Sequence, residues 1–270
     1  MFRYVAGNTI KHSIQKSNII LKSNKIPIIN YAIENVISTK NIYNEYCKLI
    51  NNIDKKTKIA IKLSSFNFDG VIINNIINNA KQKNIQVIID AEKGCDFQEY
   101  NDMSNELMYE HNTYLNCNVI KTYQMYRKDS LLHLKDDISF FIKQNKILGN
   151  KMVRGAYWNS EKNDGSLFKE KIETDLNYNE GIIYLSDKSN YCYNILATHN
   201  KESIYLGVLL NKIYNEKIFS FAHLLGMREN IFQNLNDEKI HVYIPYGPYR
   251  EMIPYLIRRL YENMDMLKYI

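Results

Sequence analysis

The sequence predicts an α/β fold, a (β/α)8 barrel in which eight parallel strands alternate with helices around one core. Three observations predict it. Short β-type runs recur eight times, amphipathic segments separate them, and the 270 residues suit one large domain of this kind. A doubly wound parallel sheet is the alternative, because it has the same alternation of strands and helices.

Several of the strand candidates are apolar without a break, which is typical of parallel strands that are covered on both faces. None of the four prolines interrupts the amphipathic segments between them. We expect strands at 26–32, 58–65, 85–92, 118–126, 150–157, 194–200, 217–225 and 241–247. We expect helices at 36–50, 72–83, 97–112, 129–143, 167–186 and 202–214.

Composition excludes several classes of protein. A net charge of +6 suits an anionic surface or a phosphorylated cofactor, but no Lys/Arg block is long enough to bind nucleic acid. No apolar run reaches the length that spans a membrane. The cysteines lack zinc spacing and no His/Asp/Glu cluster is visible, so we expect reduced structural thiols and no metal. The cysteines are Cys47, Cys95, Cys117 and Cys192.

Polar residues recur where the predicted strands end. In (β/α)8 barrels the chemistry lies at the carboxyl ends of the strands, and packing alone explains such a ring of polar residues poorly. The usual glycine-rich dinucleotide and phosphate loops are missing, as is a nucleophile elbow. The ring consists of Lys62, Asp90, Gln124, Arg154 with Tyr157, Thr198-His199-Asn200, His223 and Tyr243.

Two stretches indicate the kind of ligand. In KMVRGAYW (151–158) a strand ends in a small-residue turn between a cation and two aromatic rings, which indicates the close approach of something flat. In PYLIRRLYEN (254–263) a helix begins near Pro254, and its adjacent Arg258 and Arg259 offer two forks for a carboxylate. The alternative for this helix is a solvated Arg258–Glu262 pair of little energetic weight.

These motifs together resemble the proline dehydrogenase family, most closely its stand-alone, eukaryotic-type flavoenzymes. The resemblance covers nearly the whole chain. It rests on RYVAG (3–7), IPIINYAIEN (26–35), IDAE (89–92), TYQMY…KD (122–129), KMVRGAYW (151–158), ATHN (197–200), FAHLLGM (221–227) and YIPYG…PYLIRRLYEN (243–263), in the family's order.

The resemblance implies a single proline dehydrogenase domain over 1–270 that lacks the family's usual helices ahead of this point. It implies a distorted barrel whose last helix packs over the active-site mouth. The first 33 residues hold five Lys/Arg and no acid, as transit peptides do, but the RYVAG match favours a place within the domain. The missing helices would leave part of the barrel floor or flank exposed, so the fold would need a partner or a dimer, or would be less stable than its relatives.

The implied activity is FAD-dependent oxidation of L-proline to Δ1-pyrroline-5-carboxylate. Hydride passes to flavin N5, and the electrons pass on to a membrane quinone. Peripheral membrane contact follows, at the mitochondrial inner membrane in a eukaryote and otherwise at the cytoplasmic face of the plasma membrane. The alternatives are hydroxyproline dehydrogenase, a catalytically impaired flavin-binding pseudo-enzyme, and an unrelated barrel enzyme for an anionic metabolite.

The resemblance also implies roles for individual residues. Lys62, Arg258 and Arg259 hold the proline carboxylate, because a small substrate depends on its anion for affinity. Asp90 pairs with Lys62, and Lys151 lies near flavin N5; these two are the catalytic residues. The rings of Tyr157, Tyr243 and Tyr255 wall the substrate. The FAD ligands are Ala91, Gln124, Arg154, Gly155, Ala156, Trp158, Thr198, His199 and Glu262.

Each of these residues has a plainer structural explanation as well. Asp90 also suits a helix N-cap, His199 a satisfied core histidine, and Gln124 a hydrogen-bonding strand end. His223 and Cys95 have no family role, so we expect them to be structural.

Overall fold

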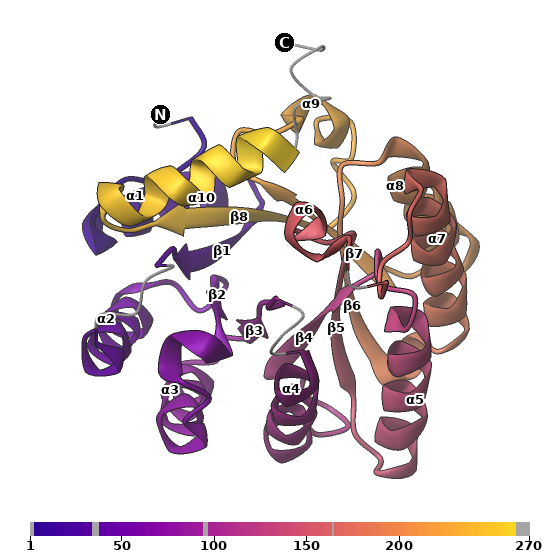
Figure 1. Ribbon diagram of the computed structural model, residues 1–270, viewed down its shortest axis with the longest axis horizontal. Helices are drawn as coiled ribbons and strands as arrows, with labels where there is room; N and C mark the ends of the chain where they lie inside the picture. The colour runs from indigo at the N-terminus through magenta and orange to yellow at the C-terminus, as the bar shows by residue number, and fades with distance from the viewer. Residues whose placement is uncertain (1–2, 34–37, 94–96, 164, 263–270) are drawn as a thin grey trace.

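The computed structural model describes residues 3–33, 38–93, 97–163 and 165–262, with only the backbone for 159–160, 254–255 and 258–262. Eight strands form a closed parallel barrel in chain order, and β8 (Ile240–Tyr246) pairs with β1 (Ile26–Tyr31) to close it. Helices surround the barrel (Figure 1). The predicted (β/α)8 class is confirmed, and the doubly wound alternative is wrong because its sheet would be open.

All eight predicted strands form, and each of the six predicted helices has a counterpart. The remaining strands are β2 (Lys58–Ile61), β3 (Val87–Ile89), β4 (Val119–Gln124), β5 (Leu148–Val153), β6 (Cys192–Ala197) and β7 (Phe219–Leu224). The predicted helices are α2 (Thr39–Asn52), α3 (Gly70–Gln82), α4 (Phe97–His111), α5 (Ser130–Lys143), α7 (Lys171–Asp187) and α8 (Lys201–Ile213). Further helices are α1 (Ile10–Lys22), α6 (Trp158–Glu161), α9 (Glu229–Phe232) and α10 (Tyr249–Glu262), with the 3-10 turns η1 (Leu63–Phe66) and η3 (Ser189–Tyr191).

Several strands end earlier than their apolar runs predict. β2 stops at Ile61, and Lys62 then caps the turn η1. β5 stops at Val153, so Arg154 and the turn after it lie outside the sheet. The chain therefore leaves the sheet where its polar residues begin, at the carboxyl edge of the barrel.

Side-chain caps set the starts of several helices. The Oγ1 atom of Thr9 accepts a hydrogen bond from the His12 amide at the start of α1, and Asp69 and Asn200 cap α3 and α8 in the same way. The sequence did not predict α1, because its buried face is Ser13, Ser17 and Ile20 and carries no apolar stripe.

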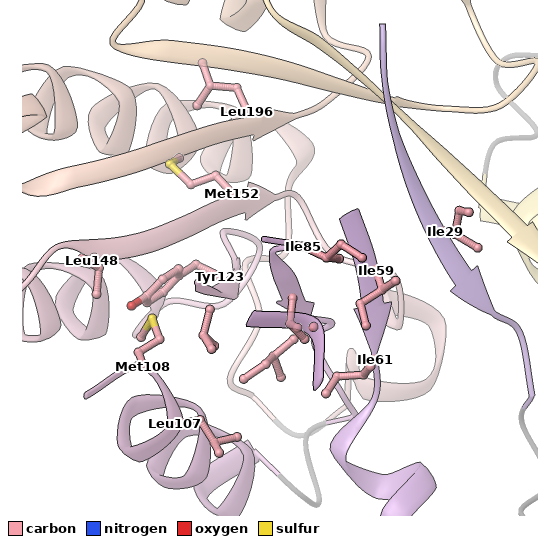
Figure 2. Packing of buried hydrophobic residues seen from close by; sticks show 14 of the residues in the cluster. Ile29, Ile59, Ile61, Ile85, Leu107, Met108, Tyr123, Leu148, Met152 and Leu196 are labelled. Carbon is pink, nitrogen blue, oxygen red and sulfur yellow. The ribbon is translucent and has the colours of Figure 1, made fainter. Parts of the chain in front are cut away.

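The barrel wall separates two apolar regions. Alternate residues of each strand face opposite sides, so Ile59 and Ile61 pack in the large cluster between barrel and helices (Figure 2). Ala60 belongs to a separate inward cluster. We call the inward cluster the lumen layer; it crosses the middle of the barrel. The lumen layer consists of Ile28, Ala60, Ile88, Cys117, Ile120, Ile195 and Ala222.

A buried ion pair ties β4 to the helices outside it. Lys121 is 1% exposed, and its Nζ lies 2.7 Å from Oδ2 of Asp137 on α5. The same Nζ donates to Asn101 and Asn105 of α4, at 2.5 and 2.8 Å, and Tyr123 donates to Asp137 at 2.7 Å. All three ammonium protons are therefore satisfied by acceptors that the two helices α4 and α5 supply.

The helix α10 packs at the carboxyl end of β1. Its Met252 is fully buried and forms a small cluster with Ala32, just after β1, and with Val5. The amide of Ala6 donates to Pro245 of β8 at 3.0 Å, so residues 3–7 belong to the folded domain. No helix in the described part of the chain is long and apolar enough to cross a membrane.

We expect Gly149→Ala to lower the free energy of unfolding by about 1–3 kcal/mol, because it overpacks the barrel wall. A Cβ at this position on β5 would clash with the carbonyl oxygen of Val119 and with Sγ of Cys117. The matched control is Gly70→Ala at the start of α3, where nothing lies within 4 Å of the new Cβ. Urea unfolding measures both, and equal midpoints for the two variants would contradict the clash.

Candidate active site

A cavity of about 430 Å³ opens at the carboxyl end of the barrel. Its wall draws on residues from β1 through β8, and Ile28 and Ala222 of the lumen layer form part of it. Twelve of the predicted site residues line it together. These are Lys62, Asp90, Ala91, Gln124, Lys151, Arg154, Gly155, Ala156, Tyr157, Thr198, His199 and Tyr243.

Asp90 holds the charged centre of the cavity. Its Oδ1 lies 2.5 Å from Nζ of Lys151, and the Tyr243 hydroxyl donates to its other oxygen, Oδ2. The Lys151 ammonium also lies 5.5 Å from the centre of the Tyr243 ring. Because the side chains of Asp90 and Lys151 are only 12% and 6% exposed, water screens this pair weakly.

The predicted pairing of Asp90 with Lys62 is therefore wrong, and so is the N-cap alternative for Asp90. Lys151 faces the lumen from β5 and reaches Asp90 from across the cavity. Lys62 follows the end of β2 and forms no ion pair with any described residue.

The charge of Lys62 affects the pKa of Glu92. Burial raises the pKa of this carboxyl, while hydrogen bonds from Ser64 and the charge of Lys62 oppose the rise. Glu92 accepts from both the amide and the hydroxyl of Ser64 at 3.1 Å, which fixes its position. Lys62 thus presents an ammonium to the cavity that interacts with Glu92 over a distance but forms no ion pair with a described carboxylate.

Arg154 lies in a network at the far side of the cavity. Its Nε donates to Asp175 at 2.7 Å, its Nη1 to Thr198 and its Nη2 to Ser203 at 3.0 Å. Burial alone would raise the pKa of Asp175, but hydrogen bonds from Lys171 and Arg154 hold it below its usual value. Asp175 therefore already neutralises the guanidinium of Arg154, which the resemblance implied to be an FAD ligand.

Gln124 presents an acceptor to the cavity. Its Nε2 donates to the carbonyl oxygen of Glu92 at 3.0 Å. A hydrogen bond at a strand end therefore explains the amide nitrogen of Gln124 but not its oxygen. Its buried Oε1 has no hydrogen-bond partner among the described residues. A buried acceptor of this kind is costly unless a ligand or water satisfies it, so it indicates where a donor of the ligand belongs.

The backbone conformation at Gly155 and the nearby ring of Tyr126 both require glycine at this position. Its φ of +144° is strained for other residues, and an added Cβ would clash with the ring of Tyr126. That ring is fixed in turn, because its hydroxyl donates to Glu161 at 2.7 Å. Gly155 therefore lets the turn pass over Tyr126 while it lines the cavity.

Trp158 lies outside the cavity wall. Its side chain is 40% exposed, and its Nε1 donates to the carbonyl oxygen of Phe168 at 3.3 Å. Lys162 lies 5.3 Å from the ring centre. In the described structure the indole therefore packs at the surface beside α6. The side chains of Tyr255, Arg258, Arg259 and Glu262 on α10 lie outside the described residues.

Sequence reasoning assigned no role to His223, which also lines the cavity. Its ring stacks on Phe232 with centres 4.6 Å apart, and its Nδ1 lies 3.0 Å from the carbonyl oxygen of Leu224. Burial lowers the pKa of His223, and its buried Nε2 has no hydrogen-bond partner among the described residues. Its place at a strand end was the one available signal. Among the described residues, no three His, Cys, Asp or Glu side chains gather to hold a metal ion.

Comparison with known proteins agrees with this fold and shows the family. The family model described as proline dehydrogenase matches residues 16–269. The chain is 31% identical over 193 residues to the carbapenem antibiotics biosynthesis protein CarD of Pectobacterium carotovorum subsp. carotovorum, covering 70% of this chain and 51% of that protein. It is 31% identical over 218 residues to the mitochondrial proline dehydrogenase 1 of Dictyostelium discoideum, covering 72% and 37%.

Among solved structures, proline utilization A from Bdellovibrio bacteriovorus, inactivated by N-propargylglycine, superposes with a TM-score of 0.89. The sequences are 19% identical, and the match covers 97% of this chain and 32% of that one, so this likeness supports the fold alone. The chain spans 51% and 37% of the length of the two relatives named above. Because the family model covers all but the first turns of the fold and the end of the chain, the chain belongs to the proline dehydrogenase family.

Proposed function

We propose that this chain oxidises L-proline to Δ1-pyrroline-5-carboxylate with bound FAD and passes the electrons to a membrane quinone. The observation that carries the proposal is the cavity itself. It brings together Lys62, Asp90, Lys151 and Tyr243 at the carboxyl end of a barrel that the proline dehydrogenase family model matches over residues 16–269.

Lys62 is the described residue best suited to the substrate carboxylate. It lines the cavity and has no ionic partner there, so an anion would satisfy a charge that is already in place. Arg258 and Arg259 complete the proposed carboxylate site from α10. The rings of Tyr157 and Tyr243 line the same cavity and offer apolar surface to a small ring, with Tyr255 proposed beside them.

The Asp90 cluster positions groups rather than removing a proton. Because Asp90 binds both the Lys151 ammonium and the Tyr243 hydroxyl, it fixes the direction in which each points. The pairing also keeps a buried cation at Lys151 next to the place where hydride transfer is proposed. These constraints hold the substrate at one orientation, which is the main contribution that a protein makes to cofactor chemistry.

The residues present fit FAD. Gln124 Oε1 is a buried acceptor without a described partner, which suits an N–H of a flat heterocycle. Thr198 accepts from Arg154 and from the Asn200 amide, so its own proton remains to be donated. Ala91, Arg154, Gly155, Ala156 and His199 line the same wall, and Glu262 and Trp158 are proposed at its margin. Bound FAD would supply the hydride acceptor.

We expect Lys62→Met to raise the KM for proline by roughly 10–100-fold and to change kcat less, because it removes one charged hydrogen bond to the substrate. The matched control is Lys143→Met, which removes an exposed lysine of α5 that lines neither of the cavities described. Steady-state kinetics with an artificial electron acceptor measures both. An unchanged KM in Lys62→Met would place the carboxylate elsewhere.

The first test is the visible spectrum of the purified protein under anaerobic conditions, before and after L-proline. The proposal predicts a flavin band that bleaches with L-proline, and that bleaches more slowly with hydroxyproline. A band that only hydroxyproline bleaches would favour hydroxyproline dehydrogenase. A band that neither bleaches would favour the impaired pseudo-enzyme, and failure to bind added FAD would overturn the proposal.

The electron acceptor and the location of the protein are also part of the proposal. A relative carries the word mitochondrial in its name, so a eukaryotic source would place this chain in the mitochondrion, at the inner membrane. Quinone-containing vesicles should reoxidise the reduced protein faster than vesicles without quinone. The net charge of +6 suits peripheral contact with an anionic membrane, so added salt should weaken sedimentation with such vesicles.

A further inference from the structure

The amino end of the barrel carries a second hollow, of about 490 Å³. It is built where β1, β2 and β8 begin, from Ile26, Lys58 and Ile240, together with the loops that precede them. The candidate active site lies at the opposite end, and the lumen layer lies between them. The proposed proline chemistry uses no residue of this hollow.

Lys58 is the unusual residue of the hollow. It lies two positions before Ala60 on β2, so it shares the lumen-facing side of that strand, and it is 6% exposed. Its Nζ donates to Oε1 of Gln86 and lies 5.3 Å from the centre of the Tyr193 ring. Among the described residues no carboxylate pairs with it.

A buried ammonium with only neutral partners is energetically costly. Burial lowers the pKa of Lys58 to about 8, and the nearby charge of Lys239 acts in the same direction. The contrast with Lys121 is informative, because that equally buried lysine has Asp137 as its anion. Lys58 is therefore a buried cation that has no carboxylate partner among the described residues.

The rim of the hollow adds further positive charge. Two acidic residues, Asp237 and Glu238, lie there as well. Glu238 is already engaged, because its carboxylate accepts from Lys217 at 3.1 Å and from Asn211 at 2.7 Å. Lys217 and Glu238 offset each other, and the four other lysines face one further carboxylate, Asp237, so the excess charge is positive. The lysines of the hollow are Lys55, Lys56, Lys58, Lys217 and Lys239.

We propose that this hollow is a binding site for a small phosphorylated molecule, whose phosphate faces Lys58 and Lys239. Several lysines around one hollow suit an anion of more than one charge, which a phosphate ester carries and a simple carboxylate does not. Lysine binds phosphate as a compact point charge. Backbone and amide groups of the hollow, including Asn84 and Gln86, remain for the rest of the molecule.

Isothermal titration calorimetry with pyrophosphate at physiological salt tests the site directly. We expect saturable binding at one site per chain, with an affinity that falls at least tenfold in Lys58→Met and several-fold in Lys239→Met. Lys143→Met removes the same charge from an exposed position outside the hollow, and it should bind like the unaltered protein. Citrate serves as the carboxylate probe, and inorganic phosphate distinguishes free phosphate from an ester or diphosphate.

The stability of Lys58→Met separates a ligand site from a structural role. Removing an unpaired buried cation should leave the melting temperature unchanged or higher without ligand, while the rise caused by pyrophosphate disappears. A large fall in melting temperature without ligand would instead make Lys58 structural. Equal binding by Lys58→Met and the unaltered protein, equal affinity for citrate, or no saturable binding would each overturn the proposal.

A chemical probe checks the position of the site independently. The aldehyde carbon of pyridoxal 5′-phosphate condenses with a lysine Nζ, forming an imine and releasing water, and borohydride reduces the imine to a stable amine. We expect peptide mapping to find Lys58 labelled ahead of the exposed lysines and protected by pyrophosphate. Labelling spread evenly over exposed lysines would contradict the proposed site.

Discussion

Asp90→Ala is expected to lower proline turnover by roughly 10²–10³-fold, which corresponds to about 3–4 kcal/mol of activation free energy, because it removes one partner of a buried ion pair in the cavity. Asp90 binds Lys151 at 2.5 Å and accepts a hydrogen bond from Tyr243. Without it, the Lys151 ammonium is left uncompensated inside the cavity, and the Tyr243 hydroxyl loses its acceptor. Anaerobic single-turnover reduction by L-proline measures the effect on the chemical step.

Two further variants isolate the cause. Asp90→Asn keeps an acceptor for Tyr243 but removes the charge that pairs with Lys151, so its activity should lie between the unaltered protein and Asp90→Ala. Asp136→Ala removes an exposed acid from α5 and should change turnover less than twofold. If Asp90→Ala retained turnover within threefold while binding flavin normally, the contacts of Asp90 with Lys151 and Tyr243 would be structural. Other residues would then have to position the substrate.

Asp137→Ala is expected to lower the free energy of unfolding by about 3–5 kcal/mol, because it strands the fully buried charge of Lys121 between β4 and two helices. Burial already lowers the pKa of Lys121, against the opposing influence of Asp137. Removing the carboxylate also takes an acceptor from Tyr123, which donates to Asp137 at 2.7 Å. Urea unfolding followed by circular dichroism measures the loss.

The exposed pair between Lys135 and Glu180 supplies the control. Its charged atoms lie 2.9 Å apart, against 2.7 Å in the buried pair, but both side chains are at least 35% exposed, so Glu180→Ala should cost only about 0–1 kcal/mol. The double variant Lys121→Met with Asp137→Leu should recover most of the stability that Asp137→Ala loses, since it removes both charges together. A similar loss for Asp137→Ala and Glu180→Ala would contradict the importance of burial.

The barrel was predictable because its signals are local. Unbroken apolar runs mark the strands, and the helices between them show their period in the sequence. The helix α1 was missed for a physical reason. It packs Ser13 and Ser17 inward, and Ser17 makes a hydrogen bond to Thr57 at 3.1 Å, so its buried face carries a polar contact where periodicity looks for apolar residues.

The sequence predicted which residues line the candidate site, but it did not predict which of them form ion pairs with one another. Residues such as Lys62, Asp90 and Gln124 lie at strand ends, and closure of the barrel brings strand ends together. Which cation meets Asp90 depends on the reach of a side chain across the cavity from β5, and this is a tertiary property without a local signal. Likewise, the network that neutralises Arg154 requires Asp175 and Ser203 from two different helices.

The pairing of β1 with β8 has a consequence for how the protein is made. The two strands begin more than two hundred residues apart in the chain, at Ile26 and Ile240. During synthesis, every strand up to β7 emerges before the one that seals the barrel, and two unpaired edges stay open in the meantime. The nascent chain is therefore a candidate for chaperone holding until β8 leaves the ribosome and pairs with both β1 and β7.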